Sequence, residues 1–171
     1  MPILESLRQV ESEMFDDHHP LAKEPLAMRE AYAIGYTMLA CVNGYPSEIV
    51  KKQLKREILA LSLPSKFRKT AIEIALNADP DVIYQILTML VEPRQKYIFM
   101  LDLYEYAFQD QKVTEREQEF LLLFERLLQL NADDLHFVRG FRLAMLKKDV
   151  ELASKVVQEA ISCSLSIPLQ E

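Results

Sequence analysis

The chain has few residues of the types that many catalytic and cofactor-binding motifs need. Its 171 residues include three glycines, two cysteines and no tryptophan. Gly35, Gly44 and Gly140 are far apart, which excludes a P-loop, a dinucleotide-binding fingerprint and a nucleophile elbow, because each needs several glycines close together. The zinc motif HExxH is also absent from the sequence. These absences favour a non-catalytic protein over an enzyme.

The cysteines and the lengths of the hydrophobic runs predict the cellular compartment of the protein. Cys41 and Cys163 belong to no CxxC pair or metal-spaced cluster, which predicts two buried thiols in a reducing compartment. No apolar run approaches the roughly 18 residues of a membrane span. The segment 1–20 carries five acidic residues and lacks the apolar core of a signal peptide. We therefore expect a cytoplasmic protein with no integral membrane segment.

Charge and composition limit the classes of partner that the chain is expected to bind. The net charge is −6, which argues against nucleic acid and anionic lipid as general partners, because both select for excess Lys and Arg. Half of the residues are hydrophobic, enough for the core of one domain. No cofactor motif is present in the sequence. A protein partner is the expectation that remains.

Periodicity and punctuation predict an all-α chain. An amphipathic helix should begin at Leu4 and end near His18, and Gly44 should close a second helix that begins near Pro25. Ser47 should cap a third helix whose buried face includes Leu54 and Ile58. Prolines should start the next three helices, near 64–77, 80–91 and 93–109, and further helices should follow at 114–130, 131–148 and 150–163.

The helix after Thr114 has the clearest start. Thr114 and Glu117 form a capping box pattern, in which each side chain accepts a backbone N–H of the other residue. The following residues are apolar over most of the helix circumference. This pattern predicts a helix at the centre of the core.

A segment of nine residues recurs. Residues 40–48 and 107–115 align at an offset of 67, with Ala40 on Ala107 and Asn43 on Asp110. Leu54 and Leu61 fall on Leu121 and Leu128 at the same offset. We predict two units, roughly 25–92 and 93–162, that pack with approximate two-fold symmetry. The expected fold is a single-domain bundle of about eight to nine helices. It would span 25–163, with residues 1–24 outside the repeat and residues 164–171 as a tail.

The recurring segment resembles the tellurite-resistance TerB-like family. The second copy carries the resemblance best, from Ala107 through Asp110 and Thr114 to Glu117. The family's paired acidic positions, suspected of cation binding, fall here on Asp110 and Glu117. The resemblance therefore implies a metal site at these residues, formed by two carboxylates and water. The alternative is that Asp110 ends one helix and Glu117 serves the capping box of the next.

Two other clusters attract attention. The run Asp16-Asp17-His18-His19 has metal-ligand residue types, but adjacent positions at a helix end point in different directions, which favours a solvated terminus. Basic residues concentrate in one stretch, which we interpret as a partner surface or as an exposed face balanced by the acidic half of the chain. They are Lys51, Lys52, Lys55, Arg56, Lys66, Arg68 and Lys69.

Two classes of function follow. The first is a cytosolic, non-catalytic interaction or scaffold module, linked by the resemblance to stress response. Its recognition surface would be the N-terminal helix or the basic residues Lys51, Lys52, Lys55 and Arg56. The alternative is a divalent-cation module or metal-dependent enzyme that uses Asp110 and Glu117. Residues 1–24 could also pair two copies of the chain, because their apolar stripe must be covered.

Overall fold

The described part of the chain is helical. The computed structural model describes residues 3, 4, 6, 7, 19–109, 112–130, 136, 140 and 155, and no strand occurs among them. The all-α prediction is confirmed for these residues. The helices are α2 (Leu26–Ala40), α3 (Glu48–Ala60), α4 (Phe67–Leu76), α5 (Pro80–Met89), α6 (Pro93–Phe108) and α7 (Glu115–Leu127). The helices predicted at 131–148 and 150–163 and the tail lie outside the described residues, apart from His136, Gly140 and Lys155.

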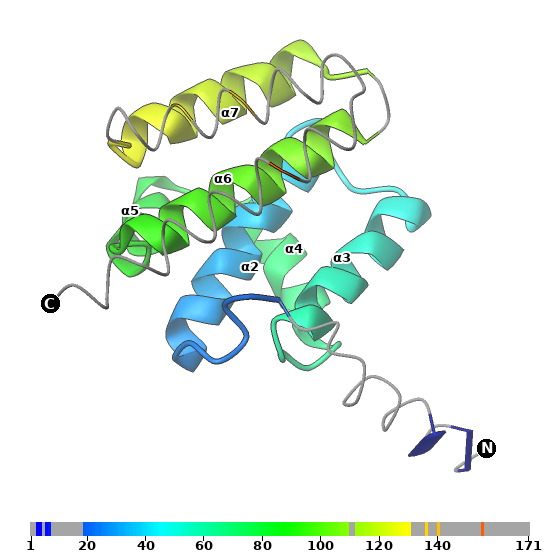
Figure 1. Ribbon diagram of the computed structural model, residues 1–171. Helices are drawn as coiled ribbons and strands as arrows, with labels where there is room; N and C mark the ends of the chain where they lie inside the picture. The colour runs from blue at the N-terminus through cyan, green and yellow to red at the C-terminus, as the bar shows by residue number, and fades with distance from the viewer. Residues whose placement is uncertain are drawn as a thin grey trace, which may run out of the picture.

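The centre of the core lies between α2 and α6. Helix α2 contacts α3, α4, α5 and α6, and Figure 1 shows α6 crossing in front of it. Tyr32 on α2 and Phe99 on α6 are fully buried and meet edge to face, with ring centroids 5.1 Å apart. Each such side chain contributes roughly 1.5–3 kcal/mol by leaving water. The two helices approach closely at Gly35, where a Cβ atom would lie 2.8 Å from the Phe99 ring.

Helix α7 does not lie at the centre of the core, so that prediction was wrong. Figure 1 shows α7 beside α6, with the chain reversing direction between them. Only Leu121 and Phe124 of α7 are buried, whereas Leu122, Leu123 and Leu127 are 42–45% exposed. An apolar circumference predicts burial on all sides, but the helix packs through one face, which carries Leu121 and Phe124.

Side chains start several of the helices as the sequence predicted. Ser47 Oγ accepts the N–H of Val50 at 3.3 Å, and the side chains of Thr114 and Glu117 form the predicted capping box. Thr114 Oγ1 accepts the N–H of Glu117 at 3.1 Å. These contacts satisfy N–H groups that have no partner within their own helix.

One predicted helix start was misplaced. Helix α4 begins at Phe67, not at Pro64, because the end of α3 determines the geometry of the intervening residues. Ser62 adopts a φ of +56°, and the N–H of Leu63 donates to the carbonyl of Ile58 at 3.0 Å. This is the pattern of a Schellman motif. Residues 64–66 then form a tight turn, in which Phe67 N donates to Pro64 O at 2.9 Å.

The turn after α2 follows the sequence pattern in part: Gly44 lies in the turn, but the helix is capped at Cys41, three residues before the glycine that was predicted to close it. Helix α2 ends at Ala40, and Gly44 adopts a φ of +116°, a region that side chains disfavour. Cys41 is buried behind this turn, and its burial raises the pKa of the thiol to about 11. Cys41 is therefore a protonated core residue at neutral pH, as expected, while Cys163 lies outside the described residues.

Candidate functional site

The structure describes only one of the two residues predicted to bind a metal ion. Asp110 lies outside the described residues. Glu117 uses both carboxylate oxygens: Oε2 accepts the N–H of Thr114 at 3.4 Å, and Oε1 accepts Asn43 Nδ2 at 3.1 Å. Across the residues that the structure describes, no group of three or more His, Cys, Asp or Glu side chains is arranged to hold a metal ion. The role of Glu117 that the structure does display is in the capping box.

The two recurring segments touch each other through these residues. Asn43 belongs to the first copy, and its Nδ2 donates to Thr114 Oγ1 of the second copy at 3.2 Å. The Thr114 hydroxyl is also within 3.4 Å of Asn43 Oδ1. The turn that ends α2 is therefore fastened to the cap that starts α7.

The basic stretch divides into two sets. Lys52, Lys55 and Arg56 project from α3 as exposed side chains. Lys51 instead faces α4, where Arg68 and Lys69 come from the neighbouring helix. Helices α3 and α4 pack against each other, which brings residues far apart in the sequence together. Of the four predicted surface residues, Lys51 lines the cavity between these two helices.

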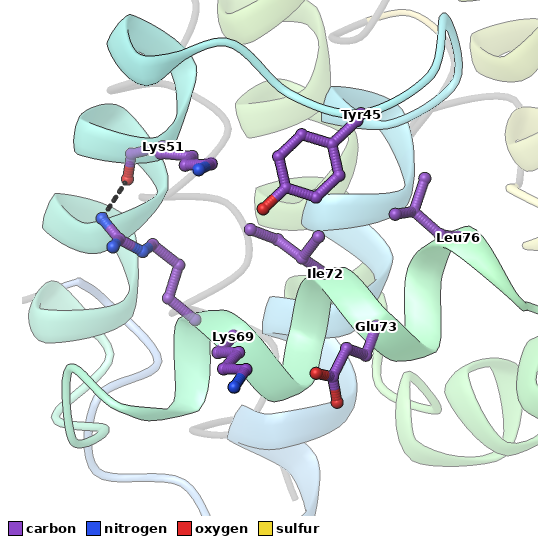
Figure 2. A pocket seen from close by; sticks show the side chains of 7 residues that line it. Tyr45, Lys51, Lys69, Ile72, Glu73 and Leu76 are labelled. Carbon is purple, nitrogen blue, oxygen red and sulfur yellow. Dashed lines mark hydrogen bonds between the residues drawn. The ribbon is translucent and has the colours of Figure 1, made fainter.

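That cavity is a basic pocket of about 300 Å³ between α3 and α4. Figure 2 shows Tyr45 and Lys51 pointing toward each other, with Ile72 and Leu76 of α4 on the side of the tyrosine ring and Glu73 pointing away from it. Ile72 is buried and forms an apolar floor, while Tyr45 is 68% exposed and forms an aromatic wall. The lining is completed by Arg68 and Lys69. We call this set of seven residues the basic pocket.

Local contacts hold the cations in place. Lys51 Nζ lies 3.0 Å from Glu48 Oε1 and 4.8 Å from the centroid of the Tyr45 ring. The hydrogen bond with Glu48 raises the pKa of Lys51 and lowers the pKa of Glu48, so both groups are charged at neutral pH. Arg68 donates from Nη1 to the backbone carbonyl of Lys51 at 3.0 Å, which fixes the guanidinium in the lining of the pocket.

The chemistry of the basic pocket suits an anionic group attached to an apolar one. Arg68 offers planar N–H donors that match a carboxylate, and Lys51 and Lys69 add two more positive charges. The exposed ring of Tyr45 and the side chain of Leu76 supply apolar contact area beside these charges. No nucleophile and base are paired in the lining, which consists of these residues with Ile72 and Glu73.

A second polar site escaped the sequence analysis. His19 was expected at a solvated helix terminus, but its side chain is only 6% exposed, so that expectation was wrong for this residue. His19 Nε2 lies 2.6 Å from Asp102 Oδ2, and the hydroxyl of Tyr32 donates to the same oxygen. Asp16, Asp17 and His18 lie outside the described residues.

The hydrogen bonds identify the protonation state of His19. Its Nδ1 accepts the backbone N–H of Leu21 at 3.0 Å, so Nδ1 carries no proton and Nε2 donates to Asp102. The ring is therefore neutral, and the negative charge of Asp102 is not cancelled by it. Burial and then the Asp102 carboxylate raise the pKa of Tyr32, which keeps its hydroxyl protonated as a donor.

Two further carboxylates lie near Asp102. Glu57 of α3 and Glu105 of α6 line a small cavity together with Asp102. Burial and then the Asp102 charge raise the pKa of Glu57 to about 7, and the same causes in the same order raise the pKa of Glu105. No sequence signal could have found this cluster, because Glu57 and Asp102 meet only through the packing of α3 and α6 beside α2.

The chain was compared with known proteins. No protein-family model matches it, and neither the curated proteins nor the solved structures contain a significant match. None of the helices in the described part of the chain combines the length and apolar composition needed to cross a membrane. We therefore infer function from the two polar sites described above.

Proposed function

We propose that this protein is a non-catalytic protein-interaction module whose basic pocket receives an acidic segment of a partner protein. The observation that carries the proposal is the pocket of about 300 Å³ in which three cations surround an apolar floor and an exposed tyrosine. A pocket of this size accommodates one or two side chains. An acidic residue beside an apolar one would contact Arg68 and Tyr45 together.

The charge distribution favours a protein segment over a polyanion. A nucleic acid or an anionic bilayer extends beyond the pocket and would be repelled by the net charge of −6 on the molecule. A short segment meets the three cations Lys51, Arg68 and Lys69 in the pocket, whose lining includes one carboxylate, that of Glu73. Electrostatic attraction is then local and effective within about a Debye length of 10 Å.

The test uses a fluorescein-labelled peptide of alternating Glu and Leu, measured by fluorescence anisotropy. Lys69→Glu should weaken binding by about tenfold or more, because it reverses a charge in the pocket. Lys55→Glu is the matched control: it makes the same change of net charge at an exposed position of α3 outside the pocket. Its affinity should stay within about twofold of the parent.

Tyr45→Ala tests the aromatic wall separately, and it should weaken binding of the Glu-Leu peptide more than binding of a Glu-Ser peptide. Equal losses in Lys69→Glu and Lys55→Glu would show a response to net charge alone and overturn the proposal. Binding to vesicles of phosphatidylserine in preference to the peptide would overturn it as well.

The architecture beyond the described helices is part of the same proposal. We infer a TerB-like bundle of about eight to nine helices, built from two symmetric units and located in the cytoplasm, with a role in stress response. The contact between Asn43 and Thr114 supports this arrangement, because it joins corresponding segments of the two repeats. Residues Leu4 and Leu7 are exposed, which supports pairing of two chains through residues 1–24.

The divalent-cation alternative stays a prediction. Its residues are Asp110 and Glu117. The carboxylate of Glu117 already accepts the backbone N–H of Thr114 in the capping box, so a metal ion would have to compete with this hydrogen bond. Calcium and zinc titrations followed by thermal melting separate the two functions, because an ion bound to the native state raises the melting midpoint. An unchanged midpoint at millimolar metal would remove the alternative.

A further inference from the structure

Residues from three helices enclose a second cavity, away from the basic pocket. Tyr36 comes from α2, Gln53 and Glu57 from α3, and Asp102, Glu105 and Tyr106 from α6. We call these residues the carboxylate notch. Its cavity of about 30 Å³ is large enough for a water-sized group. Gln109 completes the lining and accepts a hydrogen bond from Gln53 across the notch.

The notch holds negative charge that the described residues do not neutralise. Glu57 and Glu105 form no ion pair or hydrogen bond within the described part of the chain. Asp102 has His19 beside it, but the histidine is neutral, as its hydrogen bond from Leu21 requires. Arg56, whose charge lowers the pKa of Glu57, is an exposed residue. Concentrating carboxylates in a partly buried place is costly unless a cation joins them.

Tyr36 supplies a second and independent observation. Its side chain is only 5% exposed and lines the notch, yet its hydroxyl has no hydrogen-bond partner among the described residues. The hydroxyl is not one of the fully buried polar atoms that lack a partner in the described part of the chain, so it is accessible to a ligand that enters the notch. The ring of Tyr36 also packs against the ring of Tyr106, with centroids 5.5 Å apart. The notch therefore offers carboxylate oxygens, one hydroxyl and two aromatic rings.

We propose that the carboxylate notch binds a primary ammonium group. An ammonium has three N–H donors, is about the size of a water molecule and gains from nearby aromatic rings. A planar guanidinium is larger than an ammonium and fits this small cavity less well. A metal ion fits less well, because no three of the acidic side chains described are arranged as its ligands. The ammonium belongs to a lysine side chain of a partner or to a free alkylamine.

The electrostatics of the notch agree with this assignment. Burial, followed by the charge of Asp102, raises the pKa of Glu57 to about 7, whereas the charge of Arg56 acts in the opposite direction. The pKa of Glu105 is raised by the same two causes, and Tyr36 stays protonated. A bound cation favours the ionised carboxylate and should lower the pKa of Glu57. Binding should accordingly weaken as the pH falls below about 7, where Glu57 takes up a proton.

The experiment titrates the full chain with n-butylammonium at pH 8 and follows the side-chain carboxyl carbon of Glu57 by NMR. A saturable shift and a lower pKa of Glu57 are expected. Glu57→Gln and Tyr36→Phe, monitored at Glu105, should each weaken binding by about threefold to tenfold. Glu119→Gln removes an exposed carboxylate of α7 and should leave binding unchanged. Circular dichroism checks that each variant is folded.

Three further ligands test whether the ammonium group comes from a partner protein or from a free amine. Tetramethylammonium carries a similar charge without N–H donors and should not bind. A peptide with one free lysine should bind if the source is a partner protein, and its acetyl-lysine counterpart should not. Binding of n-butylammonium alone would assign the notch to free amines.

Absence of a saturable shift for both the amine and the peptide would overturn the proposal. So would equal binding to the parent and to Glu57→Gln. The basic pocket takes no part in these measurements, so their outcome is separate from the test of the acidic peptide.

Discussion

At the scale of single residues, Asp102 makes the most consequential polar contacts in the described core. Its Oδ2 accepts from His19 and from Tyr32, which come from the segment before α2 and from α2 itself. The ring of His19 also packs edge to face against Tyr32, with centroids 4.9 Å apart. One carboxylate thus satisfies two donors in a place where water has little access.

Removing this acceptor should be costly. Asp102→Leu leaves the Nε2–H of His19 and the hydroxyl of Tyr32 buried without a partner, and should lower the free energy of unfolding by roughly 2–5 kcal/mol. Asp102→Asn keeps an oxygen of similar position, and should cost less than half as much. Urea denaturation monitored by circular dichroism measures both changes. Equal losses in the two variants would contradict the role of the acceptor.

This residue-scale network is also where sequence reasoning failed. His19 follows two aspartates in a polar stretch, which indicates a solvated helix end, and its partner is 83 positions later. No periodicity or capping pattern links residues at that separation. The same limit applies to the basic pocket: Lys51, Arg68 and Lys69 were recognised as a basic stretch, but the wall of Tyr45 and the floor of Ile72 came from the packing of α3 on α4.

At the scale of elements, the starts of helices were the most predictable features. Ser47 and Thr114 accept backbone N–H groups only three residues away, so their capping roles can be recognised from the neighbouring sequence. The extent to which each helix is buried was less predictable. The exposure of Leu122, Leu123 and Leu127 on α7 depends on which neighbours cover the helix, and composition alone does not specify them.

The cap at Thr114 should have a measurable contribution to stability. Thr114→Ala removes the acceptor of the Glu117 N–H and the contact with Asn43, and should lower the unfolding free energy by about 1–2 kcal/mol. Thr70→Ala is the control, because Thr70 is exposed within α4, and should change it by about 0.5 kcal/mol or less. Thermal melting of both variants checks this expectation. A Thr114→Ala protein as stable as the Thr70→Ala protein would contradict it.

At the scale of the whole molecule, charge of opposite sign is concentrated in two places. The basic pocket lies between α3 and α4, and the carboxylate notch lies between α2, α3 and α6. Helix α3 contributes Lys51 to the first and Glu57 to the second, so it presents opposite charges on two sides. Both sites depend on the position of this one helix.

The notch should make stability depend on pH. The folded chain keeps a proton on Glu57 up to about pH 7, whereas the ordinary pKa of the group is 4.5. Unfolding therefore releases this proton between those pH values, and the contribution of Glu57 to stability declines as the pH rises through that window. Glu57→Gln should remove this decline and stabilise the chain at pH 8 more than at pH 5. Chemical denaturation at both pH values measures it, and an equal effect of the substitution at the two pH values would contradict the prediction.

The bond between His19 and Asp102 also has a consequence for the order of folding. Its two residues are 83 positions apart, so the histidine finds its acceptor only after α2 and α6 have docked and closed the intervening chain. We expect the contact to be absent from the folding transition state and to form last. Weakening it would then leave the folding rate nearly unchanged and accelerate unfolding. In kinetic terms, the segment before α2 attaches to a core that has already formed, and its detachment should be an early step of unfolding.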